Sequence, residues 1–227
     1  MRTRNCAHVT NSGLVLQNIN KTHKNLEISL VRSVIMIKDN PPKIVIIGFG
    51  FLMGYLYPCY SRLYSEKEME NCIIAVTADE ATLEEKRAKY DFPILLHDNM
   101  GALQTLYPDI ILFAPPPSVA PALTESVLVP YFQQLRTEKK PLPDLYVFPP
   151  SPQGNYYIQM LGQDIHVCNI LPNMVSQING ISLEGKEGNT HITIPDGHPW
   201  PQENLARLQS FFAPLGGVVA VKPEHVL

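Results

Sequence analysis

The sequence predicts an α/β protein built on a doubly wound, mostly parallel sheet, and three observations support this. Short, continuous apolar runs recur from residue 43 onward, as expected for strands that are buried on both faces. Stretches rich in helix formers separate these runs, and glycine or proline follows several of them. Strands and helices that alternate at this spacing imply right-handed crossovers, and such sheets bind ligands beyond the carboxyl ends of their strands.

The first part of the pattern contains five expected strands with helices between them. A helical segment follows the first glycines, to about residue 64, and others are expected at 81–90, 99–107 and 121–135. Prolines end the fourth and fifth strands, because proline cannot continue a hydrogen-bonded ladder. The expected strands are residues 43–48, 72–77, 93–96, 109–114 and 144–148.

The rest of the chain continues with strands and one more helix. Apolar runs at 165–171 and 191–194 predict two strands. A helix is expected from 201 to about 215, because the glycine pair 216–217 is a natural helix stop. The last expected strand is 218–221.

Composition narrows the class of protein. Hydrophobic residues make up 45% of the 227 residues and charged residues 17%, so the chain can bury a sizeable core. The net charge of −3 argues against a generally basic nucleic-acid-binding surface, and the apolar stretches are far short of a membrane span. The four cysteines lack CxxC spacing and are too sparse for a disulfide scaffold. We therefore expect a cytoplasmic protein with no nucleic-acid or membrane partner.

Residues 1–40 differ from the rest, and we expect them to be a poorly ordered extension of a domain that spans residues 41–227. No acidic residue occurs before Glu27, whereas four lysines and arginines do. This composition is typical of an organellar transit peptide, so import stays open as an alternative to the cytoplasm. The other interpretation is an upstream extension, with translation beginning near Met36.

The candidate binding motif is a glycine-rich loop, Gly48-Phe-Gly50-Phe-Leu-Met-Gly54, between the first strand and the first helix. Gly48 permits a tight turn, Gly50 lets a pyrophosphate approach the backbone, and Gly54 permits close packing of helix on strand. The N–H groups and the positive end of the helix favour phosphates. The third glycine stands one position later than in GxGxxG, and the alternative is that the glycines serve the turn alone.

Preference between NAD and NADP should be set directly after the second strand. An acid there, Asp79 or Glu80, usually binds the ribose 2′-hydroxyl and repels a 2′-phosphate, which favours NAD. Thr77 could instead donate to a phosphate, and at least one of the two acids is better explained as a cap of the next helix. The sequence therefore predicts a nicotinamide dinucleotide, NAD or NADP, without deciding between them.

No further cluster in the sequence carries a recognisable chemistry. His97 and His198 are weak candidates for acid–base catalysis at the ends of expected elements, and we interpret His166 as structural. Cys72 and Cys168 fall in expected buried strands and are interpreted as small core residues. No group of histidine, cysteine, aspartate or glutamate has the spacing of metal ligands. The catalytic residues therefore stay unknown, and no metal site is predicted.

Six segments in order, KIVIIGFGFLMG, AVTAD, LHDN, LFAPP, ILPNMVSQINGIS and GHPWPQENLARLQSFFAPLGGVVAV, carry a family resemblance. Over about residues 43–221 the sequence resembles the N-terminal NAD(P)-binding domain of the pyrroline-5-carboxylate reductase family. The resemblance implies a Rossmann-like fold and an oxidoreductase that transfers hydride between a nicotinamide cofactor and a C=N or C=O carbon. It also implies a small-molecule substrate as a second partner.

The resemblance assigns cofactor-binding roles along these segments. Asn99 matches an asparagine that reaches the cofactor, the 114–116 turn lies beside the nicotinamide ribose, and Asn173 belongs to the segment that lines the nicotinamide side. With the glycine loop and the end of the second strand, the expected cofactor-binding residues are Gly48, Phe49, Gly50, Phe51, Leu52, Met53, Thr77, Asp79, Asn99, Ala114, Pro115, Pro116 and Asn173.

Departures from the family pattern bear on function. A proline replaces the lysine of the family's turn, at position 115 or 116, and Met174-Val175 replaces Thr-Pro. The chain ends at Leu227, where the family's all-helical dimerisation unit should begin, so we expect the Rossmann-like domain without that unit. A homodimer with a shared site stays open. The alternatives are a non-catalytic dinucleotide-binding or interaction module, a fragment without its substrate domain, and another member of the 6-phosphogluconate dehydrogenase-like group.

Overall fold

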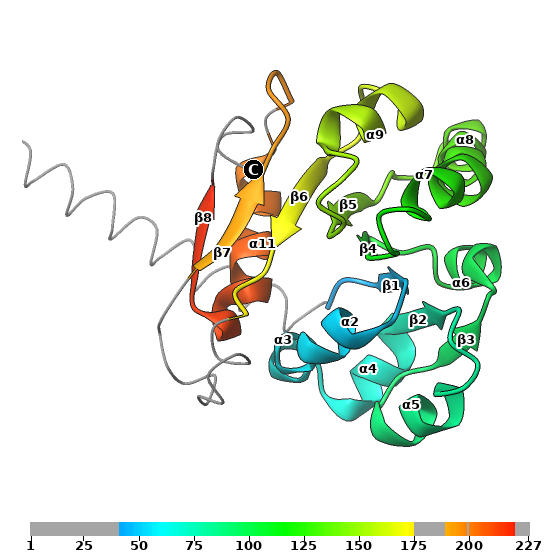
Figure 1. The fold of residues 1–227 in the computed structure, drawn as a ribbon. Helices are drawn as coiled ribbons and strands as arrows, with labels where there is room; N and C mark the ends of the chain where they lie inside the picture. Colours follow the sequence, from blue (N-terminus) through cyan, green and yellow to red (C-terminus); the bar gives the residue numbers. More distant parts are fainter. Residues whose placement is uncertain (1–40, 175–188, 199, 221–227) are drawn as a thin grey trace, which may run out of the picture.

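The structure is a computed structural model that describes residues 41–174, 189–198 and 200–220, and these form one sheet with helices on both faces (Figure 1). The strand order is β3-β2-β1-β4-β5-β6-β7-β8, and β3 and β8 lie at opposite ends of the sheet. Strands β1 to β6 are parallel, β7 is antiparallel to β6, and β8 is parallel to β7. The order of the first six strands is that of doubly wound nucleotide-binding sheets. The predicted Rossmann-like, mostly parallel α/β fold is confirmed.

Each predicted strand is present, with ends shifted by one or two residues. Every residue of β1, β2, β4 and β5 is buried, as the continuous apolar runs predict for strands covered on both faces. The strands are β1 Ile44–Ile47, β2 Ile73–Thr77, β3 Ile94–Leu96, β4 Ile110–Phe113, β5 Asp144–Val147, β6 Val167–Leu171, β7 Asn189–Thr193 and β8 Gly217–Ala220.

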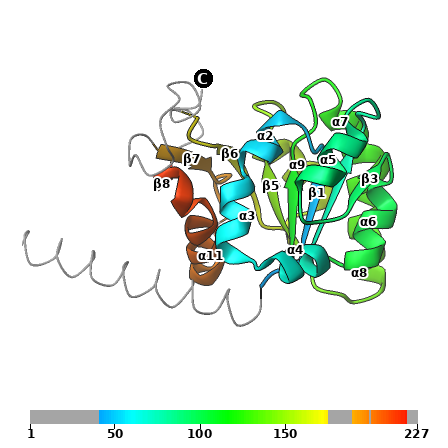
Figure 2. The same cartoon turned by 90° about the horizontal axis from the view of Figure 1, so that it is seen from below.

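The helices fill the crossovers between the strands. α3 lies next to α11 in both views, although the two helices are far apart in the sequence (Figures 1 and 2). The helices are α2 Phe51–Tyr55, α3 Tyr57–Leu63, α4 Glu66–Cys72, α5 Leu83–Lys89, α6 Asn99–Leu106, α7 Ala120–Leu123, η1 Thr124–Leu128, α8 Val129–Thr137, α9 Gly154–Leu161, α11 Gln202–Phe212 and η2 Ala213–Leu215.

Alternate residues of each strand face two separate cores. Ile44 and Ile46 of β1 face one core, which the helices α2, α3, α4, α5 and α11 cover. Val45 and Ile47 face the other, which α6, α7, α8 and α9 cover. This alternation follows from the two-residue period of a strand. Both faces of the sheet are therefore covered by helices, and a ligand can approach at the ends of the strands.

Two helices, α4 and α9, are absent from the sequence prediction. α4 begins with a capping box, in which Glu68 N–H donates to Ser65 Oγ (3.4 Å) and Ser65 N–H to Glu68 Oε2 (2.7 Å). α9 follows a proline-rich loop, and its buried face is short. Cys72 is the last, half-buried residue of α4, so its placement in a buried strand was wrong, whereas Cys168 lies buried in β6 as predicted.

The helix predicted at 121–135 is divided into α7, the π-helical turn η1 and α8. Pro130 stands in the first turn of α8, where it has no N–H to donate and its ring crowds the preceding turn. A wider π turn before a proline relieves that crowding. The expected extension at 1–40, the family match at 175–182 and the last residue of the final strand lie outside the described residues.

Candidate functional site

The strand order reverses between β1 and β4, which is where doubly wound sheets bind their ligands. Gly48 follows β1 and Ala114 follows β4. Gly48 has φ of +90°, in the left-handed region, and a Cβ on it would lie 2.6 Å from the carbonyl carbon of Ala114. The Ala114 N–H also donates to the carbonyl of Ile47 at 2.8 Å. The glycine loop therefore lies in backbone contact with the end of β4.

Two side chains of the loop anchor it in the core. Phe49 is 1% exposed, and its ring meets the rings of Tyr90 and Phe92 edge-on, with centroids 5.0 and 5.5 Å apart. Met53 is fully buried, and its sulfur lies 3.8 Å from the Tyr60 hydroxyl. The predicted roles of Phe49 and Met53 toward a cofactor therefore rest on their backbone atoms.

The other loop residues differ in how far they face solvent. A Cβ on Gly50 would meet no atom within 4 Å, whereas a Cβ on Gly54 would collide with the Tyr90 hydroxyl. Phe51 is 72% exposed and Leu52 is half-buried. The first amides of an α-helix have no acceptor within the helix, and in α2 they include those of Phe51 and Leu52. Open backbone at Gly50 beside unpaired amides is suited to an anionic group.

A hollow of about 300 Å³ lies between this loop and α5. It has the size of a small ligand site. Its walls come from the glycine loop, the start of α2 and the inner side of α5, and it is lined by Phe49, Gly50, Phe51, Gly54, Tyr55, Thr82, Glu85, Lys86, Lys89 and Tyr90.

A polar network joins the end of β2 to α5. The Thr77 hydroxyl oxygen, in a residue 4% exposed, accepts from Asp79 N–H at 3.1 Å and from Lys86 Nζ at 3.3 Å. Lys86 Nζ also lies 3.0 Å from Asp79 Oδ2, which accepts a bond from the Thr82 hydroxyl as well. The Thr82 hydroxyl and then the Lys86 ammonium hold the pKa of Asp79 below its usual range. The predicted residues Thr77 and Asp79 are thus brought together by a lysine.

The capping interpretation of Asp79 stays a prediction, because its carboxylate accepts hydrogen bonds from Thr82, the residue directly before α5. α5 begins at Leu83, and the Thr82 side chain itself makes no capping hydrogen bond. Lys86 is a residue that the sequence reasoning missed, because it stands among glutamates and basic residues that read as an exposed helix surface. The sequence does indicate that Lys86 lies about one turn into a helix that begins shortly after β2, and this could have pointed to it.

The remaining predicted residues on this side lie at the ends of neighbouring strands. Asn99 is the first residue of α6, and the preceding His97 N–H donates to the Thr77 carbonyl at 3.0 Å. Pro115 is buried and Pro116 exposed, and the carbonyl of Pro116 accepts from the first turn toward α7. The structure therefore groups Asn99 with Thr77, and the 114–116 turn with Gly48.

Asn173 is placed differently from the other predicted residues. Its side chain is buried, and its Nδ2 donates to the carbonyl of Leu215 at 2.6 Å. Its N–H donates to Thr190 Oγ1 at 3.2 Å, and its carbonyl accepts from the Tyr55 hydroxyl at 2.8 Å. The residue ties the end of β6 to β7, η2 and α2, so its role in binding a cofactor stays a prediction.

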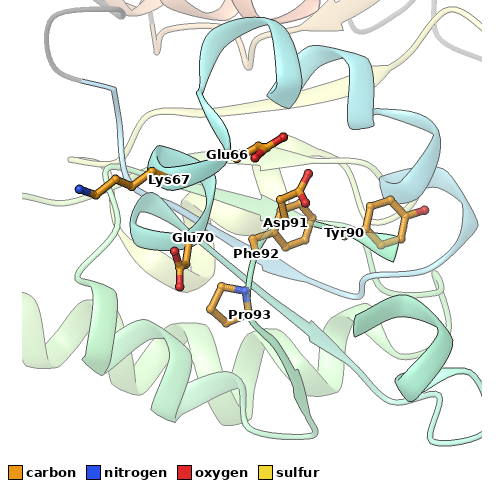
Figure 3. Close-up of a pocket in the computed structure, with 7 residues that line it drawn as sticks. All are labelled: Glu66, Lys67, Glu70, Tyr90, Asp91, Phe92 and Pro93. Carbon is orange, nitrogen blue, oxygen red and sulfur yellow. The ribbon is translucent and has the colours of Figure 1, made fainter. Parts of the chain in front are cut away.

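A second hollow lies on the other side of Tyr90 and carries mainly acidic side chains (Figure 3). It measures about 550 Å³, and the carboxylates of Glu66, Glu70 and Asp91 line it. The Lys67 ammonium points away from Asp91 and Tyr90 (Figure 3). Burial, and then a hydrogen bond to Asp91, raise the pKa of Tyr57 to about 12. Three carboxylates make this hollow unsuitable for phosphates.

A buried polar cluster lies at the amino-terminal ends of the parallel strands, opposite the glycine loop. Asp144 begins β5 and is 3% exposed, with one carboxylate oxygen 3.0 Å from His166 Nδ1. Asn204 of α11 lies 2.9 Å from both carboxylate oxygens, and Arg207 lies 3.8 Å from one. Burial raises the pKa of Asp144, although these neighbours oppose the shift. His166 is therefore part of a clamp that fastens α11 to β5, consistent with a structural role.

Within residues 41–174, 189–198 and 200–220, no three histidine, cysteine, aspartate or glutamate side chains are grouped so that they can hold a metal ion. In the same residues no helix has the length and apolar character needed to cross a membrane.

Comparison with known proteins gives similarity in structure and none in sequence. No protein-family model and no curated protein matches the chain. A pyrroline carboxylate reductase from Plasmodium falciparum with NADP bound is 12% identical, with a TM-score of 0.57 over 80% of this chain and 58% of that one. A 1-pyrroline-5-carboxylate reductase from Streptococcus pyogenes is 18% identical, with a TM-score of 0.57 over 82% and 60%.

A prephenate dehydrogenase from A. aeolicus, in complex with hydroxyphenyl propionate and NAD+, is also similar. It is 13% identical, with a TM-score of 0.55 over 81% of this chain and 60% of that one. The chain thus spans about 60% of the length of the solved structures that it matches. Identities this low show the fold. The structure resembles the N-terminal NAD(P)-binding domain of pyrroline-5-carboxylate reductases, as the sequence predicted.

Proposed function

We propose that this chain binds a nicotinamide dinucleotide across the carboxyl ends of β1, β2 and β4, as the nucleotide-binding part of an oxidoreductase. The contrast between two glycines carries the proposal. Gly48 packs against Ala114 and fixes the turn, whereas Gly50 leaves open space at the mouth of the loop. A loop that served the turn alone would have no use for a second bare position that faces solvent.

The residues present fit such a cofactor. The first-turn amides of α2, at Phe51 and Leu52, would donate to the pyrophosphate. The ribose next to the adenine would lie beside Thr77 and Asp79 at the end of β2. These two side chains contact Lys86, which lines the hollow of about 300 Å³. Ala114 and Pro115 would lie on the nicotinamide side. The two solved neighbours that hold NADP and NAD+ support this class of ligand.

The same likeness supports the proposed reaction class, hydride transfer. A bound nicotinamide supplies or accepts hydride, and the protein positions it against a C=N or C=O carbon and excludes water. The turn formed by half-buried Ala114 and buried Pro115 would hold the reacting end in place through backbone contacts. The chain covers about 60% of the length of the reductases that it resembles. We therefore propose that part of the substrate pocket is formed by residues outside this chain.

A non-catalytic dinucleotide-binding module is the second candidate, and one observation favours it. The turn at 114–116 is Ala-Pro-Pro and has no titratable side chain. The two functions differ in turnover. An oxidoreductase should oxidise NADPH or NADH when given pyrroline-5-carboxylate or another small imine or ketone, and a binding module should retain the cofactor unchanged.

The binding site is tested with Gly50→Val. Its side chain fits the free fold, because nothing lies within 4 Å of the added Cβ, but it would occupy the space of the pyrophosphate. We expect the thermal midpoint to stay within a few degrees and NAD(P)H binding, followed by nicotinamide fluorescence, to weaken at least about a hundredfold. Ser61→Val, exposed on α3, is the matched control. Unchanged affinity in Gly50→Val would remove this loop from the site.

A further inference from the structure

We propose that Lys86 and Lys89 on α5 bind the 2′-phosphate of NADP(H), so that this chain prefers NADP(H) to NAD(H). The inference rests on the dinucleotide site proposed above and names which cofactor that site takes. It reverses the preference that Asp79 alone indicates, since an acid at the end of the second strand favours the free 2′-hydroxyl of NAD.

The position of Lys86 is the first argument. Its ammonium nitrogen lies 3.3 Å from Thr77 Oγ1, at the carboxyl end of β2, where doubly wound sheets bind the ribose next to the adenine. Only 15% of its side chain is exposed, so the ammonium is held in place beside the strand end. A lysine fixed there presents a point charge to a phosphate without first losing much side-chain freedom.

The hydrogen bonds that Asp79 already makes also favour a phosphate at Lys86. Its Oδ2 accepts from Lys86 Nζ at 3.0 Å and from the Thr82 hydroxyl, so its charge is already offset. A phosphate carries nearly two negative charges at neutral pH and competes for Lys86 with the single charge of Asp79. The Asp79 side chain is 48% exposed and can turn toward solvent when a phosphate binds. The acid therefore holds the lysine in place until the phosphate replaces it.

The charge of the hollow is the third argument. Lys89 follows Lys86 by three positions, so both lie on one side of α5, and both line the hollow. Glu85 is the one acid among the ten residues that line the hollow, and Asp79, which pairs with Lys86, lies outside this lining. Thr77 Oγ1 accepts from two donors, so its own hydroxyl hydrogen is available to a further acceptor. A phosphate oxygen supplies that acceptor.

Calorimetric titration with NADPH and with NADH tests the inference. The wild-type chain should bind NADPH at least about tenfold more tightly than NADH. Lys86→Gln should weaken NADPH binding roughly ten- to a hundredfold and change NADH binding by less than about threefold. Lys67→Gln is the matched control, because it removes the same charge from an exposed lysine of α4 that points away from Tyr90 (Figure 3). It should change neither affinity.

Two more measurements distinguish a failure of the NADP(H) preference from a failure of the dinucleotide site itself. Adenosine 2′,5′-bisphosphate should bind more tightly than adenosine 5′-monophosphate to the wild-type chain and equally weakly to Lys86→Gln. Asp79→Asn should strengthen NADPH binding relative to NADH, because it removes the negative charge that competes with the phosphate for Lys86, while the amide oxygen can still accept from the lysine. NADH binding that equals or exceeds NADPH binding, or an unchanged NADPH affinity in Lys86→Gln, would overturn this inference alone. Binding of neither cofactor would overturn it together with the proposed function.

Discussion

Gly48 lies so close to Ala114 that a Cβ on the glycine would stand 2.6 Å from the carbonyl carbon and the carbonyl oxygen of Ala114. The contact joins the ends of β1 and β4, the two strands at which the chain changes direction across the sheet. Gly50, the open position of the loop, follows Gly48 by two residues. The geometry of the candidate site therefore depends on the absence of one methyl group.

Gly48→Ala should destabilise the fold. The substitution places a side chain at φ of +90° and against backbone atoms that cannot move independently of β4. Strain and overpacking together should lower the free energy of unfolding by about 2–5 kcal/mol. Denaturant unfolding measures this. A loss below about 0.5 kcal/mol would contradict the backbone contact with Ala114.

Phe49→Ala and Phe51→Ala should differ sharply although the two residues are near neighbours. Phe49 is 1% exposed within a cluster of rings, so its truncation should cost about 3–5 kcal/mol of stability. Phe51 is 72% exposed, and its truncation should change stability by less than about 0.5 kcal/mol. Equal effects in denaturant unfolding would show that the loop is packed differently.

Asp144→Asn should change how stability depends on pH. Burial raises the pKa of Asp144 in the folded state, so the folded chain holds that proton more tightly than the unfolded chain. The stability from this group is present below about pH 4 and is lost as the pH rises through the folded pKa. The difference in unfolding free energy, wild type minus Asp144→Asn, should therefore fall with rising pH and then level off.

Asp164→Asn provides the control of opposite sign. A hydrogen bond from Arg136 lowers the pKa of Asp164, so its contribution to stability is present above about pH 4 and is lost as the pH falls through the folded pKa. The difference, wild type minus Asp164→Asn, should rise with pH. The same slope for both variants would contradict the burial of Asp144.

Cysteine labelling should follow burial. Cys59 and Cys168 are buried and burial raises the pKa of both thiols, so very little thiolate forms in the folded protein. Cys72, at the end of α4, is half-buried. With iodoacetamide at about pH 8, peptide mass spectrometry should find Cys72 modified before Cys59 and Cys168, which should react after denaturation. Modification of Cys59 as fast as Cys72 in the folded chain would refute this arrangement.

Much of the fold could be predicted because burial on both faces leaves a strong sequence pattern. The runs around Ile44–Ile47 and Ile110–Phe113 are continuous and apolar, and Gly48 and Pro115 end them. α9 was harder to predict, because Pro149 to Pro152 precede it and its buried face is made of three side chains besides Gly154. Its existence depends on packing against β6 rather than on local propensity.

Site residues whose role depends on backbone geometry could be predicted from the sequence. Site residues whose role depends on side-chain contacts between distant segments could not. Gly48 and Gly50 have different roles that follow from their positions after a strand. The role of Lys86 was not predicted, because it depends on hydrogen bonds from its ammonium group to Thr77 and Asp79 at the end of β2. The direction of the Asn173 amide, toward Leu215, likewise depends on a contact distant in sequence.

Calorimetric titration of the unmodified chain with NADPH and NADH tests whether the chain binds a nicotinamide dinucleotide. We expect each chain to bind one nucleotide, with NADPH in the micromolar range or tighter, since the glycine loop, the hollow beside it and Lys86 are all in place before the ligand arrives. Heat of binding absent for both nucleotides at millimolar concentration would contradict it. The glycine loop would then serve the turn between β1 and α2 and no ligand.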